Sequence, residues 1–206
     1  MTDEDRKLDP RQFTNYLSVD LAVSTAQRRD YSVFIVGGVD ERNVLHIRHV
    51  LKERMDAMQI MDTIFKLAQR HSISLLIIEK GIIEKSLGPF IRAEMLKRGK
   101  FLNIETINPS TDKVTRARSI QARMRAQGVK FDKSKEWYVP LEQEMLRFPK
   151  DVHDDQVDAM SNLGLILDKL QDGPTIKELE EEDWEMEQAQ FVEFDIQQGR
   201  NFYTGY

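Results

Sequence analysis

Several features that mark common protein classes are missing from this chain of 206 residues. It contains no cysteine, which excludes disulfides, cysteine-ligated zinc and thiol catalysis. No apolar run approaches the roughly 20 residues of a membrane span, and the first residues lack the basic-then-apolar order of a signal peptide. None of the histidines forms a His-Glu-x-x-His pattern, which argues against a zinc hydrolase. We therefore expect one main soluble domain that stays in the cytoplasm.

Net negative charge is concentrated at the end of the chain, although most of the acidic residues precede it. Segment 172–206 has a net charge of −8, whereas residues 1–171 are left with +3 of the overall −5. This shift predicts a lead-in over 1–14, a folded domain over 15–171 and an acidic, flexible tail over 172–206. Because the tail ends in several aromatic residues, three interpretations stay open: a solvated tail, a docking segment for a protein partner, or a mimic of nucleic acid.

Apolar periodicity predicts three strands joined by short loops, followed by alternating helices and strands. The expected strands span 15–23, 31–39, 43–51, 73–79, 102–107 and a short pair at 129–131 and 137–140. The expected helices span 55–71, 86–98, 112–127, 140–148 and 154–170. The helix over 112–127 is expected to turn its basic residues outward and to stop at Gly128. This order is typical of an α/β sheet with helices on its faces.

Two acids stand in or at the end of predicted strands. Asp20 lies in a strand whose apolar residues alternate with polar ones, so its side chain faces whatever covers the sheet. Glu79 closes a nearly continuous apolar run that is typical of a strand buried on both faces. Either acid alone is explained by a salt bridge to a nearby basic residue.

Three more acids crowd the start of the last long helix, in His153-Asp154-Asp155-Gln156-Val157-Asp158-Ala159. Asp158 is three residues from Asp155 and four from Asp154, spacings that bring side chains to one face of a helix. Asp154 is explained as a helix cap, and the other acids favour the helix N-terminus. Considered together with the two strand acids, the cluster indicates a site for something positively charged.

A basic segment precedes this helix, and Asp132 is its only acid. It comprises Lys113, Arg116, Arg118, Arg123, Arg125, Lys130, Lys133 and Lys135. Such a segment fits contacts to the DNA backbone, which carry no sequence information and weaken with salt. The alternative is an ordinary solvated helix face, because the arginines do not share one stripe. Lys113, Arg116 and Arg123 are the better-aligned set.

These acids, in this order, carry a resemblance to a known family. Val19-Asp20-Leu21-Ala22, then Ile77-Ile78-Glu79, then the His153–Ala159 motif together resemble the nuclease domain of phage terminase large subunits. The resemblance covers about residues 15–170, and the His-Asp-Asp-x-x-Asp-Ala motif is its most specific part. It implies an RNase H-like mixed central sheet, with the first three strands antiparallel, flanked by helices. It also implies a metal-dependent endonuclease that cuts concatemeric viral DNA during genome packaging, in the cytoplasm of the infected host cell.

The resemblance further implies that the acids hold two divalent cations. Carboxylates suit the hard ions Mg²⁺ and Mn²⁺, and two such ions support phosphodiester hydrolysis. The expected catalytic and metal-binding residues are Asp20, Glu79, Asp155 and Asp158, with Asp20 bridging both ions. The last two resemble the paired final acids of RuvC-type resolvases and are therefore favoured over Asp154, although one of them or both could touch metal. The expected DNA-binding residues are Lys113, Arg116, Arg118, Arg123 and Arg125. His153 and Lys80 are expected beside the metal ligands, Lys80 paired with an acid or touching a phosphate.

One absence departs from the family pattern. Terminase large subunits resemble a two-part motor, but this chain has no Gly-x-x-x-x-Gly-Lys-Ser/Thr phosphate loop and hence no ATPase site. We expect an excised nuclease domain whose partners are double-stranded DNA, an ATPase domain of the same full-length protein, a portal and a small terminase subunit, with no membrane. Rival interpretations are a RuvC-like junction resolvase and a non-catalytic DNA-binding or assembly module. An actin-like kinase is disfavoured because its glycine-rich phosphate loops are missing.

Overall fold

A computed structural model describes residues 9, 12–22, 31–82, 87–108, 112–150 and 154–172. Its strands are β1 (Thr14–Asp20), β2 (Ser32–Val39), β3 (Leu45–Glu53), β4 (Ile73–Glu79), β5 (Ile104–Ile107) and β6 (Val129–Phe131). Its helices are α2 (Ala57–Arg70), α3 (Lys80–Ile82), α4 (Gly88–Arg98), α5 (Lys113–Arg125), α6 (Tyr138–Arg147) and α7 (Asp155–Asp172). The chain divides into two units, Met1–Ile166 and Leu167–Tyr206, and the sheet belongs to the first.

The six strands form one mixed sheet in the order β5-β4-β1-β2-β3-β6. The first three strands are antiparallel, whereas β4 pairs with β1, β5 with β4 and β6 with β3 in parallel. Parallel neighbours need crossover connections, and helices α2, α4 and α5 lie in those connections. The predicted fold, a mixed α/β sheet with antiparallel first strands and flanking helices, is confirmed.

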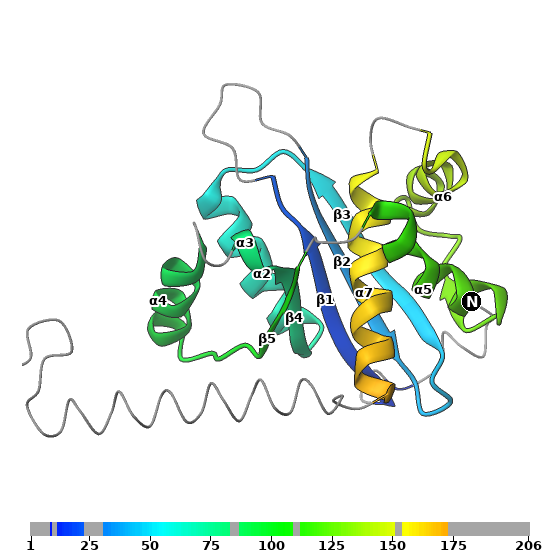
Figure 1. The fold of residues 1–206 in the computed structure, drawn as a ribbon. Helices are drawn as coiled ribbons and strands as arrows, with labels where there is room; N and C mark the ends of the chain where they lie inside the picture. Colours follow the sequence, from blue (N-terminus) through cyan, green and yellow to red (C-terminus); the bar gives the residue numbers. More distant parts are fainter. Residues whose placement is uncertain are drawn as a thin grey trace, which may run out of the picture. The chain divides into compact units, whose positions relative to one another are not determined.

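One face of the sheet is covered by α2 and α4 (Figure 1). Alternate strand residues point to this face, among them Leu17 and Val19 of β1 and Ile78 of β4, and they share one apolar cluster with the two helices. Helix α2 begins with a capping box in which Asp56 and Gln59 exchange side-chain and backbone hydrogen bonds. Its apolar stripe, predicted from three- and four-residue spacing, forms the buried side.

The opposite face is covered by α7, with α5 and α6 beside that helix (Figure 1). Ser18 Oγ on β1 donates to the carbonyl oxygen of Ala159 at 2.7 Å, which joins the strand to the second turn of α7. Helix α5 approaches α7 so closely at Gly164 that an added Cβ there would lie 2.8 Å from the backbone nitrogen of Ile120. This approach brings one side of α5 against the start of α7.

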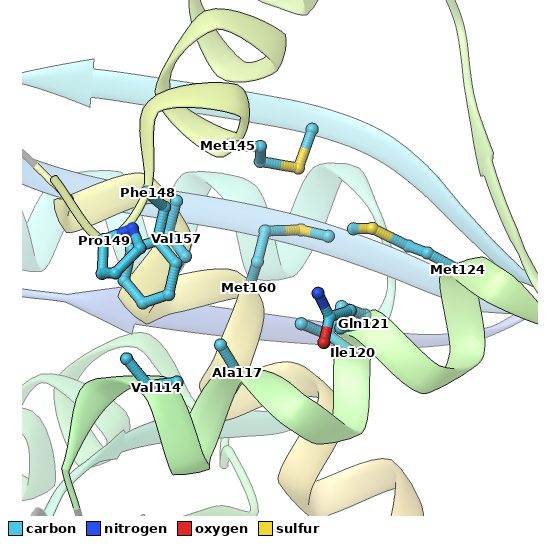
Figure 2. A pocket seen from close by; sticks show the side chains of 10 residues that line it. All are labelled: Val114, Ala117, Ile120, Gln121, Met124, Met145, Phe148, Pro149, Val157 and Met160. Atoms are coloured by element: carbon cyan, nitrogen blue, oxygen red, sulfur yellow. The ribbon is translucent and has the colours of Figure 1, made fainter. Parts of the chain in front are cut away.

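Between α5, the end of α6 and α7 lies an apolar cavity of about 240 Å³ (Figure 2). Its lining includes three methionines, Met124, Met145 and Met160, one from each of the three helices. Methionine side chains adapt to irregular spaces, so they suit a junction between three helices. The cavity lies behind the first turns of α7, since Val157 also lines it.

Two of the structural predictions are wrong. The second strand of the short pair, 137–140, is instead the start of α6, and β6 pairs with β3. A proline is tolerated there because Pro140 stands in the first helical turn, where the amide needs no partner within the helix. The helix over 112–127 does form, but it does not turn all its basic residues outward, because Arg116 is buried.

Three expectations stay predictions, because the described residues do not bear on them. Nearly all of the tail, residues 173–206, lies outside them, as does His153. The domain boundaries at 15–171 and 172–206 are likewise untested. Within the described part of the chain, the structure has no helix with the length and apolarity needed to cross a membrane.

Candidate active site

The two strand acids meet at one end and on one face of the sheet. Strands β1 and β4 are parallel neighbours in which Ser18 pairs with Ile77, and each strand ends two residues later, in Asp20 and Glu79. Side chains alternate along a strand, so Asp20 points to the same face as Ser18, which contacts α7. The apolar neighbours of the two acids point to the other face. The parallel pairing of β1 and β4 therefore brings these two acids together.

Helix α7 delivers the remaining acids to the same place. The backbone carbonyl of Asp154 accepts the amide of Asp158 at 2.8 Å, so the helix begins immediately after Asp154. Asp155 and Asp158 both repel the charge on Asp20, and Asp158 has the larger effect. Burial is the largest cause of the raised pKa of Asp158, and repulsion from Asp154 adds to it. Which of Asp154, Asp155 and Asp158 would bind metal stays a prediction.

Asp20 has the most perturbed carboxyl group of the cluster. Burial, followed by repulsion from Asp158, Glu79 and Asp155, raises its pKa from 3.8 to about 7, against a lowering by Lys113. No lysine or arginine of the described residues forms an ion pair with Asp20, whereas Glu79 and Asp155 each have one and Asp158 has two. The arrangement therefore leaves one half-buried carboxylate that lacks a countercharge in contact with it.

Two basic residues of α5 point inward at these acids. Lys113 Nζ lies 2.6 Å from Asp154 Oδ1 and 2.9 Å from Asp158 Oδ2. Burial alone would lower the pKa of Lys113, but its hydrogen bonds to the two acids outweigh this and raise it. Arg116, only 5% exposed, contacts Asp158 Oδ1 at 3.0 Å and lies 3.7 Å from Glu79. Its buried Nε and Nη1 atoms have no hydrogen-bond partner among the described residues.

A second set of contacts holds the start of α7 from the side of α6. Glu144, 8% exposed, accepts the backbone amides of Gln156 at 2.6 Å and Val157 at 3.3 Å through Oε1. Its Oε2 accepts Gln156 Nε2 at 2.7 Å and Lys52 Nζ at 2.9 Å. Lys52 also contacts Asp155 Oδ2 at 3.0 Å. The expectation that the Asp154 side chain caps α7 is wrong, because Lys113 holds that carboxylate and Glu144 supplies the cap.

The donor set fits hard divalent cations in its chemistry. The charges of Asp158, Glu79 and Asp155 all act on the half-buried Asp20, which has no protein countercharge in contact with it, and Mg²⁺ or Mn²⁺ would neutralise such an environment. As placed, no three acidic or histidine side chains among the described residues are close enough together to hold an ion. Lys52, Lys113 and Arg116 form ion pairs with three of the acids. Metal binding would require some of these pairs to loosen.

The predicted DNA-binding residues do not form one surface. Lys113 and Arg116 are committed to the acids, and Arg123 donates to the carbonyl oxygen of Asn43 at 3.1 Å. Arg118 and Arg125 are exposed. The aligned set Lys113, Arg116 and Arg123 lies on the side of α5 that contacts the rest of the domain, and DNA binding by the five residues stays a prediction. Lys80 begins α3, next to Glu79, and has contacts of its own, which leave both of its predicted roles open.

Lys52 and Glu144 are site residues that sequence reasoning missed. For Glu144 a signal exists: it lies three residues after Leu141 on the side of α6 that is buried, where an apolar residue is expected. An acid in an apolar stripe implies a buried polar partner. For Lys52 we find no such signal, because its partners lie on α6 and α7, far along the chain.

Comparisons with known proteins assign the chain to a family. The model of the terminase RNase H-like domain family matches residues 17–165, so the chain belongs to this family. Membership supports the coarse functional class, a nuclease of RNase H-like fold. No curated protein sequence matches the chain.

Solved structures are similar to this chain at low sequence identity. The HK97 bacteriophage large terminase is similar with a TM-score of 0.53 and 9% identity, over 74% of this chain and 39% of that one. The yeast mitochondrial Holliday junction resolvase Ydc2 has a TM-score of 0.47 and 10% identity, over 75% and 76% of the two chains. For T. thermophilus RuvC with a Holliday junction the values are 0.44 and 10%, over 78% and 97%.

Proposed function

We propose that this chain is a two-metal-ion endodeoxyribonuclease that cuts concatemeric viral DNA during genome packaging. Asp20, Glu79, Asp155 and Asp158 would hold the two ions, Mg²⁺ or Mn²⁺. Bound there, the ions supply an activated water, relief of phosphoryl charge and stabilisation of the leaving 3′ oxygen. The observation that carries the proposal is the half-buried Asp20, repelled by three carboxylates and without an ion pair to the described basic residues.

The other residues of the site would orient these acids. Lys113 and Arg116 hold the carboxylate of Asp158, and Lys52 holds that of Asp155. Glu144 fixes the first turn of α7, which carries both acids. Each of these contacts positions a carboxylate without itself reaching a reacting atom.

The family suggests the larger protein and the partners with which this nuclease would act. The chain spans 39% of the HK97 large terminase, so an ATPase domain elsewhere in a longer protein belongs to the proposal. The proposal also includes a portal and a small terminase subunit as partners, and the cytoplasm of the infected host cell as the location. Double-stranded DNA is the proposed substrate.

Asp20→Asn tests the chemistry. We expect plasmid nicking in Mn²⁺ to fall by about a thousand-fold or more, because several kcal/mol of charge stabilisation depend on the metal site. Asp62→Asn, on the exposed side of α2, is the matched control and should nick normally. Unchanged nicking by Asp20→Asn would reject the metal nuclease, and no nicking by the wild type in Mn²⁺ would favour a non-catalytic module. Preference for a branched over a linear or plasmid substrate would point to a junction resolvase.

A stability measurement separates lost chemistry from lost folding. The folded-state pKa of Asp20, about 7, lies above the unfolded value of 3.8, so without metal the protein loses stability as pH rises through that window. Asparagine removes this repulsion. We therefore expect metal-free Asp20→Asn to have a higher melting temperature than wild type at pH 8 and the same melting temperature at pH 4. A variant that is inactive but no less stable than wild type has lost chemistry and not folding. If Asp20→Asn is both inactive and less stable, Glu79→Gln takes its place in the test.

A further inference from the structure

A polar cleft opens between β3 and α6, beside the candidate active site. It has a volume of about 430 Å³, within the range of about 300–1,000 Å³ of ligand sites. Its lining includes Tyr31, Lys52, Gln143, Glu144, Arg147 and Gln156. Because Lys52 Nζ also lies 3.0 Å from Asp155, the cleft leads directly to the acids. We call it the α6 cleft.

Positive charge continues along the α6 cleft and past its end. Arg54 lies with Cζ 4.6 Å from the centre of the Tyr31 ring, and Lys52 Nζ is 5.3 Å from the same centre. Cations held over an aromatic ring in this way are oriented by the ring. Arg147 is shared with a neighbouring hollow of about 530 Å³ that also contains Lys150. Four basic residues thus follow one path away from Asp155.

The acid in this cleft does not cancel that path. Glu144 is buried, and its two carboxylate oxygens already accept four hydrogen bonds, from Lys52, Gln156 and Val157. The positive charge of Lys52 offsets that of Glu144, so this pair adds little net charge to the cleft. The exposed basic groups at the rim, Arg54 and Arg147, set the potential that an approaching anion meets.

The other candidate DNA-binding surface, on α5, is less suited to guide DNA to the acids. Its two basic residues nearest the acids, Lys113 and Arg116, point inward and are held there. Arg118 and Arg125 are two and nine residues from Arg116, which at 3.6 residues per turn puts both on the opposite side of the helix. Their guanidinium groups therefore point away from the acids.

We propose that the α6 cleft, with Arg54 and Arg147, and Lys150 beyond it, binds backbone phosphates of the DNA strand adjacent to the bond that is cut. The inference rests on the proposed nuclease function and adds the path of its substrate. Contacts of this kind position the strand without reading its sequence. They also make binding strongly dependent on salt.

The test compares three double variants of the full chain, each of which loses two positive charges. Arg54→Gln with Arg147→Gln changes the α6 cleft, and Arg118→Gln with Arg125→Gln changes the outer side of α5. Arg70→Gln with Arg92→Gln, on α2 and α4, is the control. Binding of a labelled DNA duplex is followed by fluorescence anisotropy in EDTA, over a series of salt concentrations.

We expect the α6-cleft variant to bind about ten-fold more weakly or worse, and its salt slope to fall by about 1.8, since each lost phosphate contact removes about 0.9. The control should bind as wild type, and Arg54→Lys with Arg147→Lys should restore most of the affinity. Wild-type binding by the α6-cleft variant, or an equal or larger loss in the α5 variant, would overturn the inference.

The two proposals fail separately. If the α6-cleft variant binds normally while Asp20→Asn is inactive, the nuclease stands and only the path is wrong. If the α6-cleft variant loses binding while Asp20→Asn still nicks DNA, the cleft stands as a DNA site and the metal nuclease is rejected.

Discussion

On one face of the sheet α2 and α4 close a continuous apolar cluster, whereas on the other face α7 brings buried polar and charged side chains against the strands. The first face contains residues such as Phe34 and Ile64, both fully buried. The second contains Asp158, Arg116 and Glu144, whose burial costs free energy unless each finds a partner. The difference indicates that one face stabilises the folded domain, whereas the other holds acids together at a cost in folding stability. We call this the division of labour between the two faces.

The largest effect is expected from replacing Glu144, the buried acid that holds the start of α7 on the polar face. Glu144→Ala would leave the amides at the start of α7 without an acceptor and Lys52 without one of its two acids. Removing one partner of a buried ion pair costs about 3–5 kcal/mol. Urea unfolding should show a loss of that size.

Glu136→Ala, an exposed acid just before α6, is the control for Glu144→Ala and should cost less than about 0.5 kcal/mol. Equal midpoints for the two variants would mean that the cap on α7 contributes nothing to stability.

On the apolar face, Ile64→Ala should cost about 2–5 kcal/mol, because it leaves a cavity in the α2 cluster. This loss should occur without any change in DNA affinity, since the face is remote from the acids. Leu96→Ala, on the exposed side of α4, is its control. A change in DNA affinity on Ile64→Ala would show that the two faces are coupled, and the division of labour would fail.

The smallest effect concerns a pair of histidines at the edge of the apolar face. His49 and His71 are stacked with ring centres 5.8 Å apart, and burial lowers the pKa of both, that of His71 to about 4. The unfolded chain takes up protons below pH 6.5 while the folded protein keeps His71 neutral, so stability falls as pH falls from 6.5 towards 4.

For this partly exposed pair we expect a contribution on the order of 1 kcal/mol, measured as the difference between wild type and the double variant in how the urea midpoint changes from pH 7 to pH 4.5, because Asp20 titrates over the same interval with the opposite sign. The double variant His49→Gln with His71→Gln should lose less stability over the same interval. An unchanged pH dependence in that variant would assign the effect to other groups.

The position of the strand acids was predictable because it depends on local pattern. Alternation of apolar residues set the face of Asp20, and the end of an apolar run set the place of Glu79. Parallel pairing then brought both acids to one edge. The partners of the acids were not predictable in this way. Spacing along α5 showed that Lys113 and Arg116 share a side, but not that this side is the buried one.

By itself, the sequence determined the order of strands and helices, the RNase H-like class and the acids that would form the site, because each of these is written in short-range periodicity and in a local motif. Tertiary structure alone decided which charges meet. Lys52 and Glu144 are 92 residues apart, and Arg116 and Asp158 are 42 apart, so their pairing depends on how α5 and α6 pack against α7. Packing, not spacing, selects which side of a helix is desolvated, and a desolvated charge must find its partner there.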